Sequence, residues 1–459
     1  MIQKLLLAAL AATLFTSCAS QDSQPSDKKE LKLNFFAEPP SLDPRTGTYS
    51  IYSNILPMLF DGLMRFDQSG ALVPSVAKEV SLSADGKTYT FRLKKTFWSN
   101  GDPVTAHDFE FAWKWILDPD NPAPMASHLY CIRGAKAANE GTAPLDAVGV
   151  FAKDSMTLVV ELEHPLPFFP EMTAIYNFFP FNARTAESEE FIGNGPFKLE
   201  KWKPHQEITL VKNRGYWDAK SVKLDRIHIS FVQDMNTELE LFERGELDWA
   251  GAPTALGLAP NAFPKLRAEE KLHCEKFLCT YFYTFNTERR PFRSPKVRHA
   301  LSKAIPRQDI CDHITQGSEE PAYGFVPPSI SYVHTKQEKL TDEQLVALYQ
   351  EGLAEQGLTP DTVSPIYITY NTSDTHHAIA QTIQHCWKEL FGLDVRLRSH
   401  DWKAHLSEIS AGNFDVARLT WKGMTSDPYH FLEIFEDPKH PMQRTSWRSN
   451  QFLAEMDQA

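Results

Sequence analysis

The sequence predicts a large α/β protein with more than one domain. From residue 31 onward, segments with the two-residue periodicity of strands alternate with segments of helical periodicity. The chain has 459 residues, of which 42% are hydrophobic and 12% aromatic. This length and composition favour two to three domains with a substantial core.

The first clear elements form a hairpin and a helix. KTYTFRLKKTFW (87–98) alternates apolar with polar side chains, which predicts a half-buried strand, and Asp85-Gly86 before it is typical of a hairpin turn. In the next segment Thr105 is a suitable N-cap, and Pro119 ends the helix that it begins.

The middle of the chain is richer in strands. GNGPFKLEKWKPHQEITLVKNRGYWD (193–218) predicts two strands joined at Lys203-Pro204, and RIHISFVQD (226–234) predicts a third. NTELELFERGELDWA (236–250) predicts a short helix, a stop at Gly245 and a short strand through Leu247 and Trp249.

Helices and strands alternate again in the C-terminal half. SPKVRHALSKAI (294–305) predicts a helix with Ser294 as N-cap and Pro295 at the first helical position. Further helices are expected over 341–356 and 375–391. The strands expected here are SPIYITYN (364–371), LDVRLRS (393–399) and FDVARLTW (414–421).

The last of these strands carries a cation where a core residue is expected. Alternation places Arg418 on the same face as Val416. This position indicates either the wall of a pocket that binds an anion, or a surface strand on which Arg418 pairs with Asp415.

The N-terminus predicts export. MIQKLLLAALAATLFTSC (1–18) has a basic residue, an apolar run and small residues before Cys18, so we expect a signal peptide over 1–17. Thr-Ser-Cys resembles the lipobox of bacterial lipoproteins, in which the Cys is acylated. Plain secretion with a spare Cys is the alternative. Residues 18–30 would then form a lipidated, flexible tether.

Net charge and hydrophobicity limit the kinds of molecule that this protein is expected to bind. The formal net charge of −12 gives no electrostatic case for nucleic acid, and no later stretch has the eighteen consecutive apolar residues that predict a membrane span. Five Cys remain besides Cys18, an odd number that leaves at least one thiol unpaired within the chain.

Nine segments, taken together, resemble the family 5 extracellular solute-binding proteins of ABC importers. They are SLDP (41–44), LFDGLMRFD (59–67), LVPSVAKEV (72–80), TFWSNGDPVTAHDFEFAW (96–113), NGPFKLEKW (194–202), LVKNRGYWD (210–218), FERGELDW (242–249), PFRSPKVRHALSKAIPR (291–307) and FDVARLTW (414–421). Their order and spacing match from about residue 31 to the end. YNTSDTHH (370–377), HDWKAHL (400–406) and DVAR make the periplasmic oligopeptide-binding proteins the most similar branch.

The resemblance implies a two-lobed periplasmic-binding-protein fold (type II, cluster C) with an extra domain on the first lobe. Domain I would span 31–60 and 182–278, the extra domain II 61–181, and domain III 279–459. In the family the chain then returns to domain I, and this return is apparently missing here. Ligand contacts to both lobes would favour the closed state.

The same resemblance implies a peptide-binding site. Arg418 and His376 match residues that face the carboxylate end of the ligand, although His376 could instead cap a helix. Trp402 and Trp421 match aromatics that line side-chain pockets, and either could instead be a core residue. Thr48, Tyr49 and Ser50 match a loop that approaches the peptide.

Two departures from the family pattern alter this expectation. Oligopeptide receptors place an Asp for the ligand's amino group where this chain has Met424. Asp427 matches a different acid of the family, which precedes a Pro. Some relatives also pair a Cys at the position of Lys422 with the position of Cys279, and Lys422 cannot form that bond.

Other chemistries have little support. The i,i+4 HExxH arrangement of metal sites, the GxSxG elbow, the P-loop and GxGxxG are not found, so we expect no cofactor, no metal and no enzyme. We expect a monomeric, lipid-anchored extracytoplasmic receptor that delivers oligopeptides, possible cell-wall peptides included, to an ABC permease and its ATPase subunits. The alternatives are a family 5 receptor for a nickel chelate, haem or a sugar, and a surface lipoprotein that transports nothing.

Overall fold

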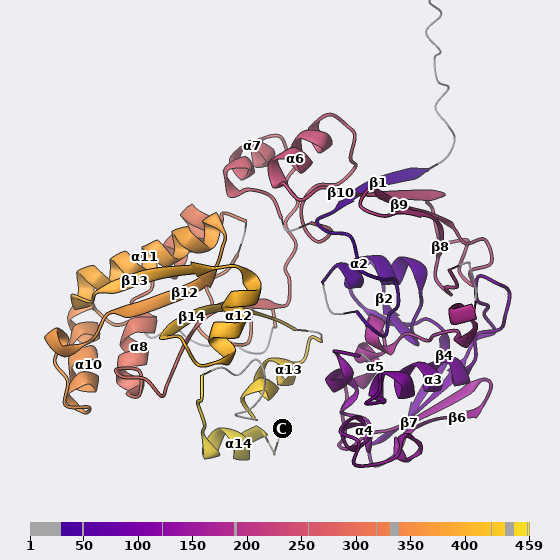
Figure 1. Cartoon of the computed structure of the whole chain (residues 1–459), viewed down its shortest axis with the longest axis horizontal. Coiled ribbons are helices and arrows are strands. Elements are labelled where there is room, and N and C mark those ends of the chain that lie inside the picture. Colours follow the sequence, from indigo (N-terminus) through magenta and orange to yellow (C-terminus); the bar gives the residue numbers. More distant parts are fainter. Residues whose placement is uncertain are drawn as a thin grey trace, which may run out of the picture. The chain divides into compact units, whose positions relative to one another are not determined.

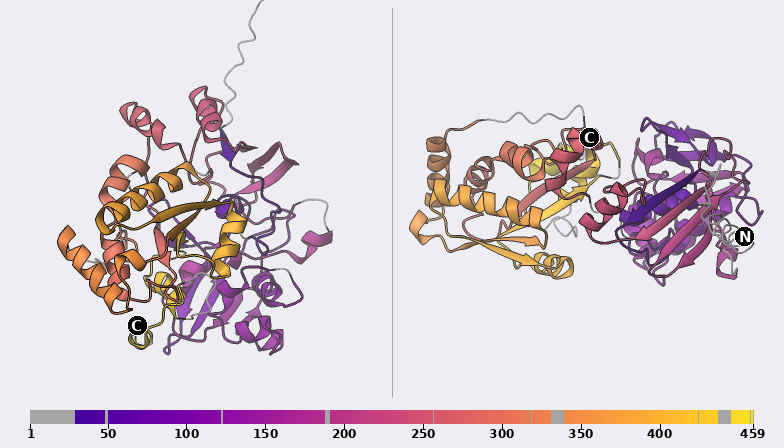
Figure 2. Two further views of the ribbon diagram at one scale, coloured as in Figure 1. Left: turned by 60° about the vertical axis from the view of Figure 1, so that its left-hand side comes forward. Right: turned by 90° about the horizontal axis from the view of Figure 1, so that it is seen from above.

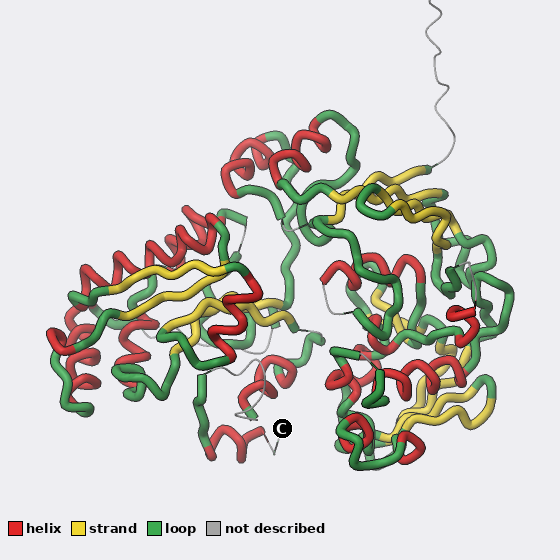
Figure 3. Tube along the Cα trace, viewed as in Figure 1, coloured by secondary structure: helices red, strands yellow, loops and turns green. Residues whose placement is uncertain are grey.

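The computed structural model divides the chain into two compact units. Unit 1 comprises Met1–Pro165 and Tyr176–Gly257, and unit 2 comprises Leu166–Ile175 and Leu258–Ala459. The structure describes residues 29–47, 50–121, 123–187, 191–255, 257–317, 319–330, 339–423, 425–436, 445–456 and 458. Figure 1 labels the helices and strands, and Figure 3 colours them by type.

The described part of unit 1 contains three sheets. The first has the order β1-β10-β9-β8, in which only β1 and β10 pair in parallel; the second has the order β4-β5-β7-β6 and is antiparallel; the third is the pair β2-β3. The strands are β1 (Glu30–Phe35), β2 (Met64–Phe66), β3 (Leu72–Pro74), β4 (Ala77–Leu82), β5 (Thr88–Leu93), β6 (Val150–Asp154), β7 (Thr157–Glu161), β8 (Phe197–Lys203), β9 (Glu207–Lys212) and β10 (Arg226–Phe231).

The helices of unit 1 follow the capping signals of the sequence. Helix α3 begins after Thr105, which forms a capping box with Asp108, and it ends at the cap residue Asp118, directly before Pro119. Its buried face carries Phe109 and Trp113, and the Trp113 indole donates to the Phe178 carbonyl at 3.0 Å. The α-helices of unit 1 are α2 (Ser50–Leu59), α3 (Ala106–Leu117), α4 (Ala135–Asn139) and α6 (Met235–Glu243).

Unit 2 is built on one four-stranded sheet. Its order is β11-β14-β12-β13, with β12 parallel to both neighbours and β11 antiparallel to β14. The strands are β11 (Cys279–Phe285), β12 (Ile366–Asn371), β13 (Val395–His400) and β14 (Val416–Lys422). The α-helices are α5 (Phe169–Met172), α7 (Phe263–Ala268), α8 (Pro295–Lys303), α9 (Arg307–Ile310), α10 (Asp342–Ala354), α11 (Asp374–Phe391), α12 (Trp402–Ser410), α13 (Tyr429–Leu432) and α14 (Asn450–Met456).

Helices cover both faces of this sheet. Side chains of α8, α10 and α11 form one apolar core with alternate residues of the strands, Val416 among them. Helix α12 covers the opposite face, where Ile409 packs on Ala417 and Leu419. Figures 1 and 2 show α11 and α12 in unit 2 from three directions. The arrangement explains why the first half of β14 has apolar side chains on both faces, with Val416 on one and Ala417 and Leu419 on the other.

Most of the predicted elements are confirmed, and one is wrong. The helix after Ser294 is α8, although the Ser294 hydroxyl bonds Glu355 rather than capping the helix. The strand expected through Leu247 and Trp249 does not form. A backbone hydrogen bond from Asp248 to Lys32 attaches this segment to β1, but no strand ladder is built there. Within the described residues, no helix has the length and apolar character that a membrane crossing requires.

Candidate functional site

Arg418 lies on the core-facing side of β14. Residues directly opposite each other in an antiparallel pair of strands share a face. Arg418 lies opposite Tyr283, and Val416, two positions earlier and so on the same face, lies opposite Phe285. Val416 is fully buried in the core under the helices, and Arg418 is 9% exposed. The alternation therefore places the Arg418 guanidinium where the apolar part of this face ends and its polar part begins.

The contacts of Arg418 are all with neutral groups. Its Nη1 donates to the side-chain oxygen of Asn371 at 3.0 Å, and its Nη2 donates to the Thr420 hydroxyl at 2.5 Å. The guanidinium carbon lies 4.5 Å from the centroid of the Tyr281 ring. The buried Nε has no hydrogen-bond partner. Among the described residues, no carboxylate forms an ion pair with this cation, so its charge is available to an external anion.

His376 stands beside this cation at the start of α11. Ser373 caps the helix, and its hydroxyl accepts the backbone N–H of His376. The His376 Nδ1 lies 3.4 Å from the Tyr281 hydroxyl. Burial, together with the positive charge of Arg418, lowers the pKa of His376 to about 4. The imidazole is therefore neutral at pH 7 and can donate or accept one hydrogen bond.

Two tyrosines that the sequence analysis did not identify complete the cluster. The hydroxyls of Tyr281 and Tyr283 are 3.4 Å apart, and both side chains come from β11. Burial raises the pKa of both phenols, so they remain protonated donors. A guanidinium, two phenols, a hydroxyl and a neutral imidazole form a set that suits a carboxylate.

A buried histidine on the other face fixes the backbone of this strand. His405 is fully buried on α12, and its Nε2 lies 2.9 Å from the carbonyl oxygen of Arg418. A carbonyl only accepts, so Nε2 carries the proton. Burial lowers the pKa of His405, which keeps the ring neutral. The sequence analysis did not identify this contact between His405 and the backbone of Arg418.

The two predicted aromatic wall residues, Trp402 and Trp421, are in contact with other histidines of unit 2. Trp421 is on the opposite face of β14, where its indole donates to the His430 carbonyl at 3.1 Å and packs near Phe431. Trp402 is the first residue of α12 and is 51% exposed, with its ring 6.0 Å from that of His405. Their role in side-chain pockets stays a prediction.

The loop after β14 is held by acids at its far end. The Asp427 carboxylate accepts the backbone N–H of Tyr429 at 2.8 Å, at the start of α13. Ser426 donates its backbone N–H to the Glu171 carboxylate at 3.2 Å and its hydroxyl to the same group at 3.3 Å. Among the described residues, Glu171 forms no ion pair.

Several predicted positions lie outside the described residues. These are Met424, Thr48, Tyr49 and Cys18. Ser50 is described only as the first residue of α2. The structure therefore leaves the roles predicted for these residues untested.

Comparisons with known proteins give the family. The model of the bacterial extracellular solute-binding proteins, family 5 Middle, matches residues 71–442. The oligopeptide-binding protein OppA of Bacillus subtilis is 39% identical over 98% of this chain and 86% of its own length. The periplasmic murein peptide-binding protein MppA of Escherichia coli is 31% identical over 89% of this chain and 78% of its own length.

Solved structures agree with this assignment. The Escherichia coli murein tripeptide binding protein MppA matches with a TM-score of 0.80 and 29% identity, over 94% of this chain and 87% of its own. Haemophilus influenzae OppA in complex with RPPGFSPFR matches with a TM-score of 0.78 and 28% identity, over 95% and 88%. The fold expected from the sequence is confirmed, and the chain belongs to the family 5 extracellular solute-binding proteins.

Proposed function

We propose that this protein is an extracytoplasmic receptor that captures oligopeptides and delivers them to an ABC permease. The observation that carries the proposal is the buried Arg418 with no carboxylate partner among the described residues. An unpaired buried cation is costly in the empty protein, and a ligand carboxylate removes that cost on binding. The names of OppA and MppA, which bind peptides, support the same substrate class.

The carboxyl end of the peptide would lie against Arg418. The orphan Nε and the Tyr281 hydroxyl can donate to the two carboxylate oxygens, and neutral His376 adds one further hydrogen bond. The same proposal has four further parts. The two lobes close on the peptide, and the peptide is transferred to a permease driven by its ATPase subunits. The receptor is a monomer and has a lipid anchor on Cys18. These parts are supported by the family membership and by the N-terminal sequence.

Mass spectrometry of co-purified ligands tests this function most directly. The protein is purified without denaturant, unfolded in acid, and the released molecules are identified. A mixture of peptides with free carboxyl ends is the expected result. One discrete non-peptide solute would instead support a receptor for another class of ligand. No ligand, together with no binding of added peptides in calorimetry, would contradict the proposal.

A further inference from the structure

Asn371 is the last residue of β12 and contacts Arg418 on the neighbouring strand. The two strands are parallel, with Ile368 opposite Val416, so both run toward the same edge of the sheet. The side-chain oxygen of Asn371 accepts a hydrogen bond from Nη1 of Arg418 at 3.0 Å. The fold therefore gives Arg418 a partner that lies 47 positions away in the sequence.

The contact with Asn371 fixes the orientation of the guanidinium. A guanidinium nitrogen only donates, so the carboxamide presents its oxygen to Nη1. The Thr420 hydroxyl holds the other terminal nitrogen, Nη2, at 2.5 Å. Two neutral oxygens thus fix the two terminal nitrogens of Arg418, while the buried Nε has no hydrogen-bond partner among the described residues.

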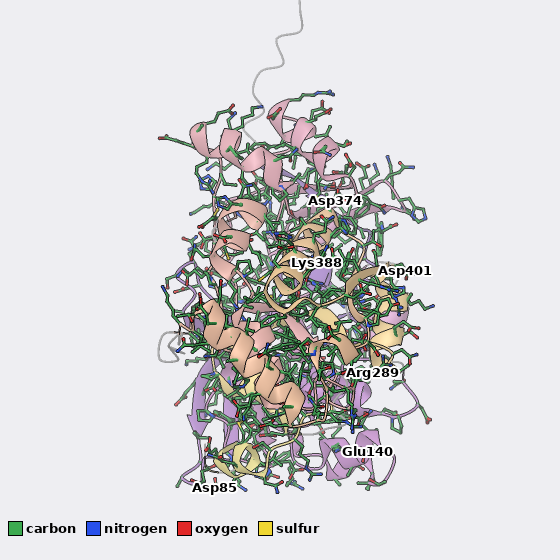
Figure 4. The ribbon with its side chains drawn as sticks, turned by 90° about the vertical axis from the view of Figure 1, so that its left-hand side faces the viewer. Asp85, Glu140, Arg289, Asp374, Lys388 and Asp401 are labelled. Carbon is green, nitrogen blue, oxygen red and sulfur yellow. The ribbon has the colours of Figure 1, made fainter. Side chains whose placement is uncertain are left out.

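An acid at position 371 would hold the guanidinium more strongly than Asn371 does. Aspartate has nearly the same shape as asparagine, and a charge-assisted hydrogen bond is roughly twice as strong as a neutral one. The acids that follow β12 and β13 in the chain, Asp374 and Asp401, are both exposed, and Figure 4 labels them. Asp401 caps α12, so its carboxylate accepts a backbone N–H of that helix. The protein therefore orients Arg418 without giving it a counter-charge from these segments.

The neutrality of Asn371 acts in opposite directions on stability and on binding. Arg418 is 9% exposed, and a buried cation without a counter-charge destabilises the empty protein. If residue 371 carried a negative charge, a ligand carboxylate would meet an ion pair of no net charge and would compete with an internal acid for the same N–H groups. Because residue 371 is neutral, the attraction of the Arg418 cation remains available to the ligand.

We propose that Asn371 is a positioning residue that makes the site selective for ligands with a carboxylate. It orients the guanidinium of Arg418 and leaves the charge of that group uncompensated. This inference rests on the proposed function, because it requires that the carboxyl end of a peptide is bound at Arg418. It has a consequence of unusual sign: an acid at position 371 should stabilise the empty protein and weaken its capture of a carboxylate.

Calorimetry and thermal unfolding together test the inference, after dialysis has removed bound peptides. The calorimetric probes are tri-alanine and its C-terminal amide. The wild-type protein is expected to bind the free acid at least about tenfold more tightly than the amide. Asn371→Asp should reduce this ratio to less than about twofold and raise the melting temperature of the empty protein by about 2–4 °C. Asn371→Gln keeps a neutral carboxamide, so it should retain the preference for the acid.

Asn413→Asp provides the matched control. It makes the same change of charge and shape at an exposed residue between α12 and β14, five positions before Arg418, and it should keep the wild-type preference. The inference is overturned by a lower melting temperature or an unchanged preference in Asn371→Asp, or by loss of the preference in Asn371→Gln. Equal binding of the acid and the amide by the wild type would also overturn it. In each of these cases peptide capture still stands, whereas binding of neither peptide by the wild type would overturn both.

Discussion

Asp415 binds Arg289 and not Arg418. Its Oδ1 lies 3.0 Å from Nη1 of Arg289, and its Oδ2 accepts the backbone N–H of Tyr367 at 3.0 Å. Both carboxylate oxygens of Asp415 are therefore bound by groups other than Arg418, which lies three positions further along the chain. The ion pair that the sequence left open as an alternative is not formed, and the Arg418 guanidinium remains without an internal counter-charge among the described residues.

Replacement of Arg418 should affect the charged end of the ligand selectively. Arg418→Ala is expected to weaken binding of a free-acid peptide much more than binding of its C-terminal amide, because a lost charge-assisted hydrogen bond costs about 1.5–3 kcal/mol. Isothermal titration calorimetry with both forms measures the difference. Equal losses for the acid and the amide would mean that Arg418 is structural.

Arg289→Ala is the matched control for this experiment. It removes an exposed cation that is paired to Asp415, and Figure 4 labels its position. An exposed ion pair contributes about 0.2–1 kcal/mol to stability. The variant should therefore unfold slightly more easily while keeping the wild-type preference for acid over amide.

His376 should make stability depend on pH. Its pKa is about 4 in the folded protein and 6.5 without the protein environment, so between these values the unfolded chain binds a proton that the folded protein does not. The free energy of unfolding should fall as pH drops from about 6.5 to about 4. After allowance for solvent screening of a partly exposed ring, this loss is about 1–2 kcal/mol.

Urea unfolding at pH 7 and pH 4.5 measures this contribution. His376→Gln retains a hydrogen-bonding side chain without the titration, so it should lose less stability between the two pH values than the wild type. His385, which lies on the same helix, provides a comparison variant through His385→Gln. If His376→Gln loses as much as the wild type, then His376 is not the group responsible.

Local signals in the sequence were sufficient to predict many of the helices and strands. The N-cap at Thr105 and the apolar spacing after Pro295 correctly located α3 and α8. The strand expected through Leu247 and Trp249 was wrong because strand periodicity does not guarantee a partner. There, one backbone hydrogen bond from Asp248 replaces a ladder.

The candidate site could be predicted only in part, because local signals in the sequence do not show which distant segments come into contact. Arg418 was identified from two signals, the cation at a position where alternation predicts an apolar residue and the resemblance of FDVARLTW (414–421) to the family pattern. Tyr281 and Tyr283 were not identified, because CTYFYTF (279–285) lacks the apolar and polar alternation of a half-buried strand. Their position beside Arg418 also depends on the pairing of β11 with β14, two segments that lie far apart in the sequence. His405 resembles an ordinary helix residue until its bond to the Arg418 carbonyl is seen.

The N-terminal prediction concerns location. We expect cleavage after Ser17 and acylation of Cys18. Cys18→Ala should release the protein from the membrane fraction, because a lipid anchor contributes about 0.8 kcal/mol of membrane affinity for each buried methylene. Fractionation followed by immunoblotting measures the change, and Ser20→Ala serves as a neighbouring control. A Cys18→Ala protein that stays in the membrane fraction would show that the lipobox interpretation is wrong.

The last prediction concerns the amino end of the ligand. Met424 is apolar and cannot pair with an ammonium, and a buried ammonium without a partner is strongly disfavoured. The Asp427 carboxylate is engaged by Tyr429, and Glu171 by Ser426. We therefore expect N-acetylation of a bound peptide to change affinity by less than about 1 kcal/mol, against the several kcal/mol of a broken buried ion pair.

Met424→Asp should restore a preference for free amines, because it returns a carboxylate to the position where the oligopeptide receptors are expected to carry one. Met424→Asn is the matched control, since it has nearly the same shape without the charge and should leave the tolerance of acetylation unchanged. Calorimetry with one peptide in its free and acetylated forms measures both variants. If the wild-type protein rejects the acetylated form by about a hundredfold, an acid already present holds the ammonium. Asp427→Asn and Glu171→Gln would then identify it, because only the true anchor loses that discrimination when it is neutralised.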